Sequence, residues 1–202
     1  MANIRVIQSP YIGPFSNIEA VFESALTSGV GIHTGELGGR VELTQTGAGT
    51  KEYQKVQLDS GAVAATPAGA PTTNQLLYWK NKQAYIVTND SRFAIGGQPS
   101  GAVGFQNEVA GVLVTPQATL TANIGIPGYI WVQQKGNCAA VKIASGSPNP
   151  GDQLTANNSA TAAQGLVTAT GTAPLTQSLG KFTTVGSSVV VAPVDLDIPG
   201  IP

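Results

Sequence analysis

Hydrophobic and polar residues alternate most clearly between residues 128 and 144, where the chain reads GYIWVQQKGNCAAVKIA. Successive residues of a β-strand point to opposite faces of a sheet, so an alternation of this kind predicts strands. Gly136 lies near the middle of the run, and glycine readily adopts the positive φ that tight hairpin turns require. The pattern therefore predicts a central β-hairpin whose turn covers residues 135–137.

Shorter alternating or apolar runs recur along the chain between glycine-rich and proline-rich segments. Residues 76–79 and 83–88 are separated by a short polar segment and predict a second hairpin. The run EVAGVLVT at residues 108–115 is mostly apolar and short, as is typical of a buried strand. The sequence PNPGD at residues 148–152 predicts a turn. Further short strands are expected at residues 40–46, 52–58, 153–155, 165–170, 180–185 and 187–192.

A helical pattern occurs near the N-terminus. Ser16 and Glu19 have the spacing of a capping box, in which two side chains satisfy backbone N–H groups of the first helical turn. Apolar residues then recur at intervals of three and four, and Gly29 is a stop signal. We expect an amphipathic helix over residues 17–28 that packs on the sheet or on a neighbouring subunit.

The two ends of the chain combine apolar residues with prolines. Pro10 and Pro14 lie near the start, and the last ten residues contain three prolines, a composition that suits extended arms better than a hydrogen-bonded ladder. The expected organisation is an N-terminal arm at residues 1–15, a helix and glycine-rich segment at 16–52, a β domain at 53–192 and a C-terminal arm at 193–202.

Composition supports the same fold class. The chain of 202 residues has 25 glycines and 13 prolines without a collagen-like period, which favours many turns between short strands. Because 42% of the residues are hydrophobic and only 10% are charged, uncharged polar residues and glycine must cover much of the surface. We expect an all-β protein, a compact antiparallel β-barrel or sandwich of short strands with one short N-terminal helix and extended terminal arms.

Charge excludes some partners. Ten basic and eleven acidic residues leave a formal charge of −1, and nucleic-acid binding is not expected without clustered positive charge. A thinly charged surface opposes self-association only weakly, so the chain suits an assembly. No apolar run approaches the ~18 residues of a membrane span, and the N-terminus lacks a secretory pattern. We therefore expect no membrane partner and synthesis in a reducing cytoplasm.

Side chains that could perform catalysis are few. His33 is the single histidine and Cys138 the single cysteine, so a Cys–His pair would have to use both, and we interpret Cys138 as a small core residue. Asp195 and Asp197 lie in the proline-rich tail, where nothing nearby would hold them rigidly for metal binding or acid/base chemistry. We interpret them as solvated charges. No enzymatic activity, metal or cofactor is expected.

Five aromatic residues of the expected strands could form a sugar-binding platform. In strands that alternate with a period of two, aromatic pairs more often pack in the core or across neighbouring strands, and we favour that interpretation. The five residues are Tyr78, Trp79, Tyr85, Tyr129 and Trp131.

Four short segments stand out: NEVAGVL at residues 107–113, PGYIWVQQKG at 127–136, PGD at 150–152 and LGK at 179–181. Together they resemble the small β domain of capsid-associated proteins of tailed bacteriophages, in which an AGV strand leads through a PG-aromatic segment into Q-x-x-G, followed by a GD turn and an LG strand. VQLDSG at residues 56–61 and LYWK at 77–80 are also similar to these head proteins. The resemblance covers about residues 53–192, and the glycine-rich segment at 29–51 departs from it, as does the helix.

The resemblance implies a capsid cement (decoration) protein that binds the outside of an icosahedral head as a homotrimer and stabilises contacts between major capsid proteins. Its partners would be the major capsid protein and other copies of the chain, and it would be made in the host cytoplasm and located on the capsid surface. Two alternatives stay open: a carbohydrate-binding module of the virion surface, with Trp79 or Trp131 exposed, and another head or tail morphogenesis protein.

Apolar residues of the two expected arms are the candidate anchors on neighbouring subunits or on the capsid. Each large apolar side chain that is fully buried contributes ~1.5–3 kcal/mol before ordering costs, so several anchors repeated three-fold would give tight attachment. The candidate anchors are Tyr11, Ile12, Phe15, Leu196, Ile198 and Ile201.

Overall fold

The computed structural model describes part of the chain, and all statements below concern that part. Within it the secondary structure consists of strands and turns without a helix, and the strands form a single mixed sheet of 11 strands. The all-β class expected from the sequence is therefore confirmed. The described residues are 3–8, 37–45, 49–59, 71–89, 109–114, 129–145, 148–156, 167–170, 179–183 and 191–198.

The strands are short, with one exception, the central strand β7. Their bounds are β1 Asn3–Gln8, β2 Arg40–Gln45, β3 Gly49–Leu58, β4 Leu76–Asn81, β5 Ile86–Thr88, β6 Val109–Leu113, β7 Tyr129–Ser145, β8 Gln153–Ala156, β9 Val167–Thr170, β10 Gly180–Phe182 and β11 Val191–Asp197.

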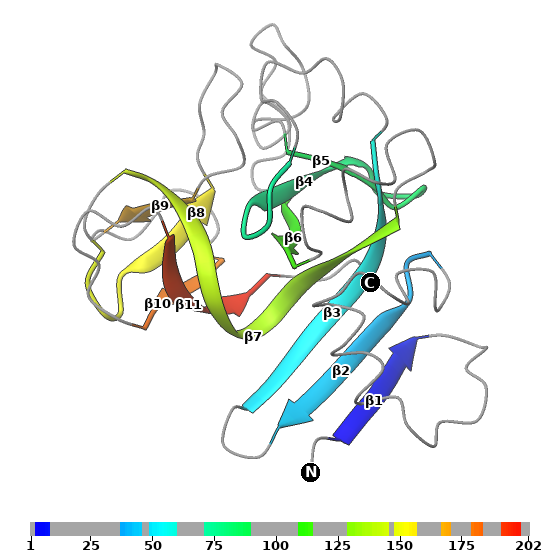
Figure 1. Ribbon diagram of the computed structural model, residues 1–202, viewed down its shortest axis with the longest axis horizontal. Helices are drawn as coiled ribbons and strands as arrows, with labels where there is room; N and C mark the ends of the chain where they lie inside the picture. Colours follow the sequence, from blue (N-terminus) through cyan, green and yellow to red (C-terminus); the bar gives the residue numbers. More distant parts are fainter. Residues whose placement is uncertain are drawn as a thin grey trace, which may run out of the picture.

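Pairing between these strands closes on itself twice, and β7 belongs to both closures (Figure 1). The first circuit runs β3-β5-β4-β6-β7 and returns to β3, whereas the second runs β7-β11-β10-β8-β9 and returns to β7. Strands β2 and β1 continue outward from β3 as a ribbon (Figure 1). Closure removes exposed strand edges, which are otherwise templates for aggregation.

The sheet is mixed rather than purely antiparallel, which corrects the expectation from the sequence. Pairs β3–β5 and β7–β9 are parallel, and all other pairs are antiparallel. The β4–β5 hairpin reverses the direction of the chain between its two strands. The returning strand, β5, is the one that lies next to β3, and it runs parallel to β3. Local alternation reports which residues share a face, but it carries no information about strand direction.

The first circuit encloses one of two hydrophobic clusters, to which all five of its strands contribute. Its buried members are Val56, Leu58, Leu77, Trp79, Val87, Ala110, Leu113, Ile130 and Val132.

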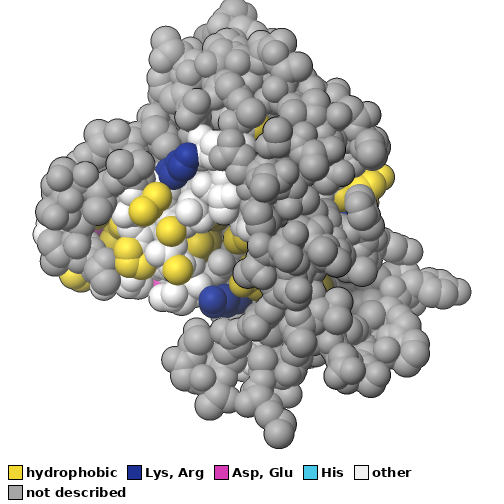
Figure 2. Space-filling model, in the orientation of Figure 1, with side chains coloured by type: hydrophobic (Ala, Val, Ile, Leu, Met, Phe, Trp, Pro, Cys, Tyr) yellow, Lys and Arg dark blue, Asp and Glu magenta, His cyan; other side chains and the backbone are white. Residues whose placement is uncertain are grey.

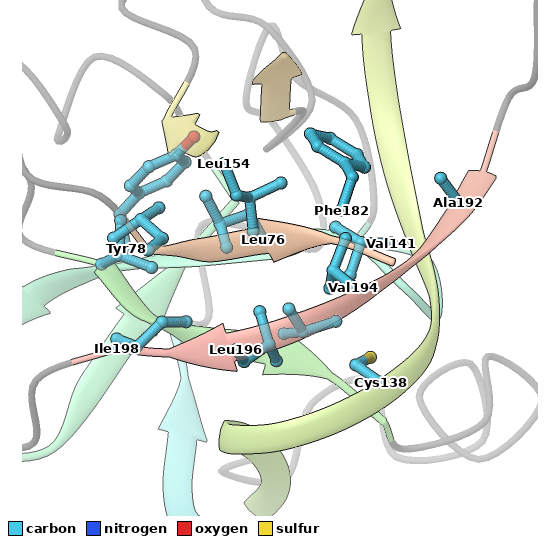
Figure 3. Close-up of a cluster of buried hydrophobic side chains, with 13 residues drawn as sticks. Leu76, Tyr78, Cys138, Val141, Leu154, Phe182, Ala192, Val194, Leu196 and Ile198 are labelled. Atoms are coloured by element: carbon cyan, nitrogen blue, oxygen red, sulfur yellow. The ribbon is translucent and has the colours of Figure 1, made fainter. Parts of the chain in front are cut away.

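The second cluster lies between the second circuit and the outer face of β4 and β6 (Figure 3). Alternate residues of β4 therefore enter different clusters: Leu76 and Tyr78 lie in this one, whereas Leu77 and Trp79 lie inside the first circuit. Strand β6 is buried along its whole length, as its apolar sequence predicts. The second cluster consists of Leu76, Tyr78, Val109, Val112, Cys138, Val141, Leu154, Leu179, Phe182, Ala192, Val194, Leu196 and Ile198.

The expected central hairpin is wrong, because β7 is one continuous strand of 17 residues. Gly136 has the positive φ that the pattern suggested, 82°, but the chain does not turn there. Instead, β7 exchanges neighbours near this point: Lys135 pairs with Glu52 of β3 and with Asp197 of β11, and residues farther along β7 pair with β11. A glycine inside a strand can mark a close backbone approach rather than a turn, and a Cβ on Gly136 would lie 2.1 Å from the Thr50 carbonyl oxygen.

Residues 193–198 do not form an extended arm. They belong largely to β11, which pairs antiparallel with both β7 and β10. Pro193 is accommodated because the register shifts between Ala192 and Val194, and such irregularities are places where a sheet tolerates proline. The β unit therefore extends beyond the expected boundary at residue 192.

The N-terminal part of the chain also joins the sheet. Residues 3–8 of the expected arm form β1, which pairs with β2, and the boundary expected between residues 52 and 53 falls inside β3. The predicted helix at residues 17–28 lies outside the described residues.

Other local predictions are confirmed. Strands β4 and β5 form the second hairpin, but its turn lies at residues 82–85 instead of 80–82, so the second strand begins at Ile86 rather than at Gln83. Strands also occur at most of the remaining expected positions. In the turn before β8, the Asn149 N–H donates to the Asp152 carboxylate at 2.8 Å and the Asp152 N–H donates to the Asn149 carbonyl at 3.0 Å. Gly151 has a φ of 89° in this turn.

Candidate interaction surface

The candidate anchors of the C-terminal tail lie in the chain's own core. Leu196 is buried in the second cluster, and Ile198, with 0% of its surface exposed, donates its backbone N–H to the Gln134 carbonyl at 2.9 Å. Side chains held this way are not available to a neighbouring subunit. Tyr11, Ile12, Phe15 and Ile201 lie outside the described residues, so their role as anchors stays a prediction.

The nucleophile considered from the sequence is poorly placed for catalysis. Cys138 is a buried free cysteine whose Sγ donates to the Ala140 carbonyl at 3.5 Å. Burial raises the pKa of this thiol, although the hydrogen bond and the positive charge of Lys51 act in the opposite direction. Because the thiolate is the reactive form, this environment suits an inert core cysteine. His33 lies outside the described residues.

The two tail carboxylates are exposed residues of a paired strand. Asp195 is the register partner of Lys181 on β10, and Asp197 that of Lys135 on β7. Opposite charges at facing positions of neighbouring strands stabilise a sheet modestly. Within the described ranges, no group of three or more His, Cys, Asp and Glu residues is placed to hold a metal ion.

The aromatic residues pack inside the protein rather than forming an open platform. Tyr78 is fully buried, and Trp79 and Trp131 each expose 3% of their surface. Trp79 also contacts the half-buried Tyr85 edge-to-face, with ring centroids 6.3 Å apart. The core interpretation is thus confirmed for both tryptophans, since neither presents its face to a sugar.

Lys55 is a buried cation beside Tyr129, the last of the five aromatic residues. Its Nζ lies 5.3 Å from the centroid of the half-buried Tyr129 ring, within the range of a cation–π interaction. Burial lowers the pKa of Lys55 from its usual value, because a charged group is disfavoured away from water. This contact ties β3 to β7 where the two strands pair.

A buried polar centre joins β3, β6 and β7, and it was not predicted from the sequence. The Gln134 Nε2 donates to the Gln54 Oε1 at 2.7 Å and to the Ala110 carbonyl at 2.9 Å. Gln54 in turn donates to the Gly38 carbonyl at 3.1 Å. The signal available in the sequence was the pair of glutamines directly after the apolar run YIWV.

The neighbouring glutamine supports the bend of β7. The Gln133 Nε2 lies 3.1 to 3.2 Å from three successive backbone carbonyls, those of Lys135, Gly136 and Asn137. This side chain therefore stabilises the irregular segment in which β7 passes from one circuit to the other. Buried polar groups with satisfied hydrogen bonds favour one arrangement of the strands over its alternatives.

Replacing Gln134 with alanine is expected to lower the free energy of unfolding by about 2–4 kcal/mol, because two buried acceptors lose their donor. Gln83→Ala is the matched control, since Gln83 is exposed in the β4–β5 turn and its loss should change stability by less than ~0.5 kcal/mol. Urea denaturation of the full chain measures both. Equal stabilities of the two variants would contradict a structural role for the polar centre.

The described surface offers few apolar contacts. Among the residues whose side-chain burial the structure describes, Val191, 37% exposed, is the one exposed large hydrophobic residue. Figure 2 shows hydrophobic side chains scattered among other atoms on the described part of one face.

One strand edge is open in the described part of the sheet. Strand β1 has β2 as its single neighbour, whereas each of the other strands has at least two. We call the side of β1 that faces away from β2 the β1 edge, and it is the candidate interaction surface. An unpaired row of N–H and C=O groups can bind another extended segment.

Comparisons with known proteins add no identification, because no protein-family model matches the chain and no curated protein is significantly similar to it. Among the described residues, no helix is long and apolar enough to cross a membrane.

Proposed function

We propose that this chain is a structural virion protein, a capsid cement (decoration) protein that binds the outside of an icosahedral phage head as a homotrimer. Its role would be to stabilise contacts between major capsid proteins, without enzymatic activity or a cofactor. The class is a binding protein of a large assembly, located on the capsid surface.

The observation that carries the proposal is the position of the residues that resemble phage head proteins. Segment 107–113 contains β6, segment 127–136 contains the first part of β7, residues 150–152 lie in the turn before β8, and residues 179–181 begin β10. The resemblance thus extends through both circuits and the strand that they share. Its residues build the scaffold, which is consistent with a protein that works by association.

Two features of the described residues support a role in assembly over a role in catalysis. Asp195 and Asp197 face lysines on neighbouring strands, and the Cys138 thiol is buried. Among the described residues, no three His, Cys, Asp or Glu side chains come together as a metal site would require. The surface is thinly charged and the chain is close to neutral, so repulsion between copies is weak. Many modest contacts repeated by symmetry can then give tight attachment to a shell.

The experiment measures binding to phage heads that lack their decoration protein. The variant Tyr11→Ala/Ile12→Ala/Phe15→Ala is expected to bind at least ~10-fold more weakly than the natural chain, because each lost anchor removes ~1.5–3 kcal/mol of burial. Asn149→Ala, in an exposed turn, is the matched control. Co-sedimentation with heads gives the occupancy, and thermal rupture of the heads gives the stabilisation.

Two results would contradict the proposal in different ways. Natural protein that neither binds heads nor raises their rupture temperature would refute the cement function itself. A triple variant that binds at natural occupancy would refute the N-terminal anchors alone. Mass measurement at low concentration adds a further discriminator, since three copies are expected and a stable ring of six or twelve would favour a tail or neck component.

A further inference from the structure

We draw no further inference here: the strongest candidate, the face of β3 and β7 on which Tyr53 and Trp131 are buried although they belong to neither hydrophobic cluster, carries none because nothing in the described part of the chain shows what covers it.

Discussion

A chain truncated after Ala192 is expected to lose the second circuit and its cooperative unfolding. The deletion removes most of β11, which is the strand between β7 and β10. It also removes Val194, Leu196 and Ile198 from the second hydrophobic cluster. Three such side chains contribute roughly 1.5–3 kcal/mol each, and this sum is comparable to the 5–15 kcal/mol that separates folded from unfolded states in most domains.

Near-ultraviolet circular dichroism and urea denaturation would measure this loss. Truncation after Ile198 is the matched control, because it retains β11 and every pairing that the structure describes for it. The control is expected to unfold in one cooperative transition near the midpoint of the full chain. Should the shorter chain keep that midpoint as well, residues 193–198 would not be part of the core, and a free C-terminal arm would again be the better interpretation.

The substitution Gly136→Ala is expected to lower the free energy of unfolding by about 2–4 kcal/mol. Two effects add. A non-glycine residue at a φ of 82° is strained by roughly 1–2 kcal/mol, and the new Cβ would lie 2.1 Å from the Thr50 carbonyl oxygen, so β3 and β7 would have to separate. The three nearest atoms all belong to the backbone of Thr50 and Lys51, so there is no flexible side chain that could move away.

Gly151→Ala separates these two effects. Gly151 has a similar φ of 89°, but a Cβ at this position would meet nothing within 4 Å. Only the backbone strain should remain, and the loss is expected to be about 1–2 kcal/mol. Urea denaturation of the two variants under identical conditions gives the difference. If Gly136→Ala costs no more than Gly151→Ala, position 136 lies in an open turn and the hairpin expected from the sequence would be restored.

Several elements were predictable because their causes are local. The turn at residues 148–152 depends on proline, on a glycine with positive φ and on an aspartate that accepts a hydrogen bond three residues away. The burial of β6 follows from its uninterrupted apolar sequence. The β4–β5 hairpin follows from two apolar runs separated by a few polar residues. None of these needs knowledge of a distant partner.

The errors share one cause, which is that pairing partners lie far away in the sequence. Position 136 requires glycine because the Thr50 backbone lies too close for a Cβ. Gln134 can be buried because its side chain donates a hydrogen bond to Gln54, which lies 80 positions earlier. Pro193 is tolerated because the pairing of β11 with β7 shifts register there. An alternating pattern is the same for a strand that ends at a glycine and one that continues past it.

By itself, the sequence determined the all-β class, the positions of most short strands and the thinly charged character of the chain, because side-chain alternation and turn chemistry act over a few residues. Only the tertiary structure decided that β7 passes unbroken through two circuits and that Leu196 and Ile198 belong to the core. Those properties depend on which strands become neighbours, and hydrogen bonds between strands form at any separation along the chain.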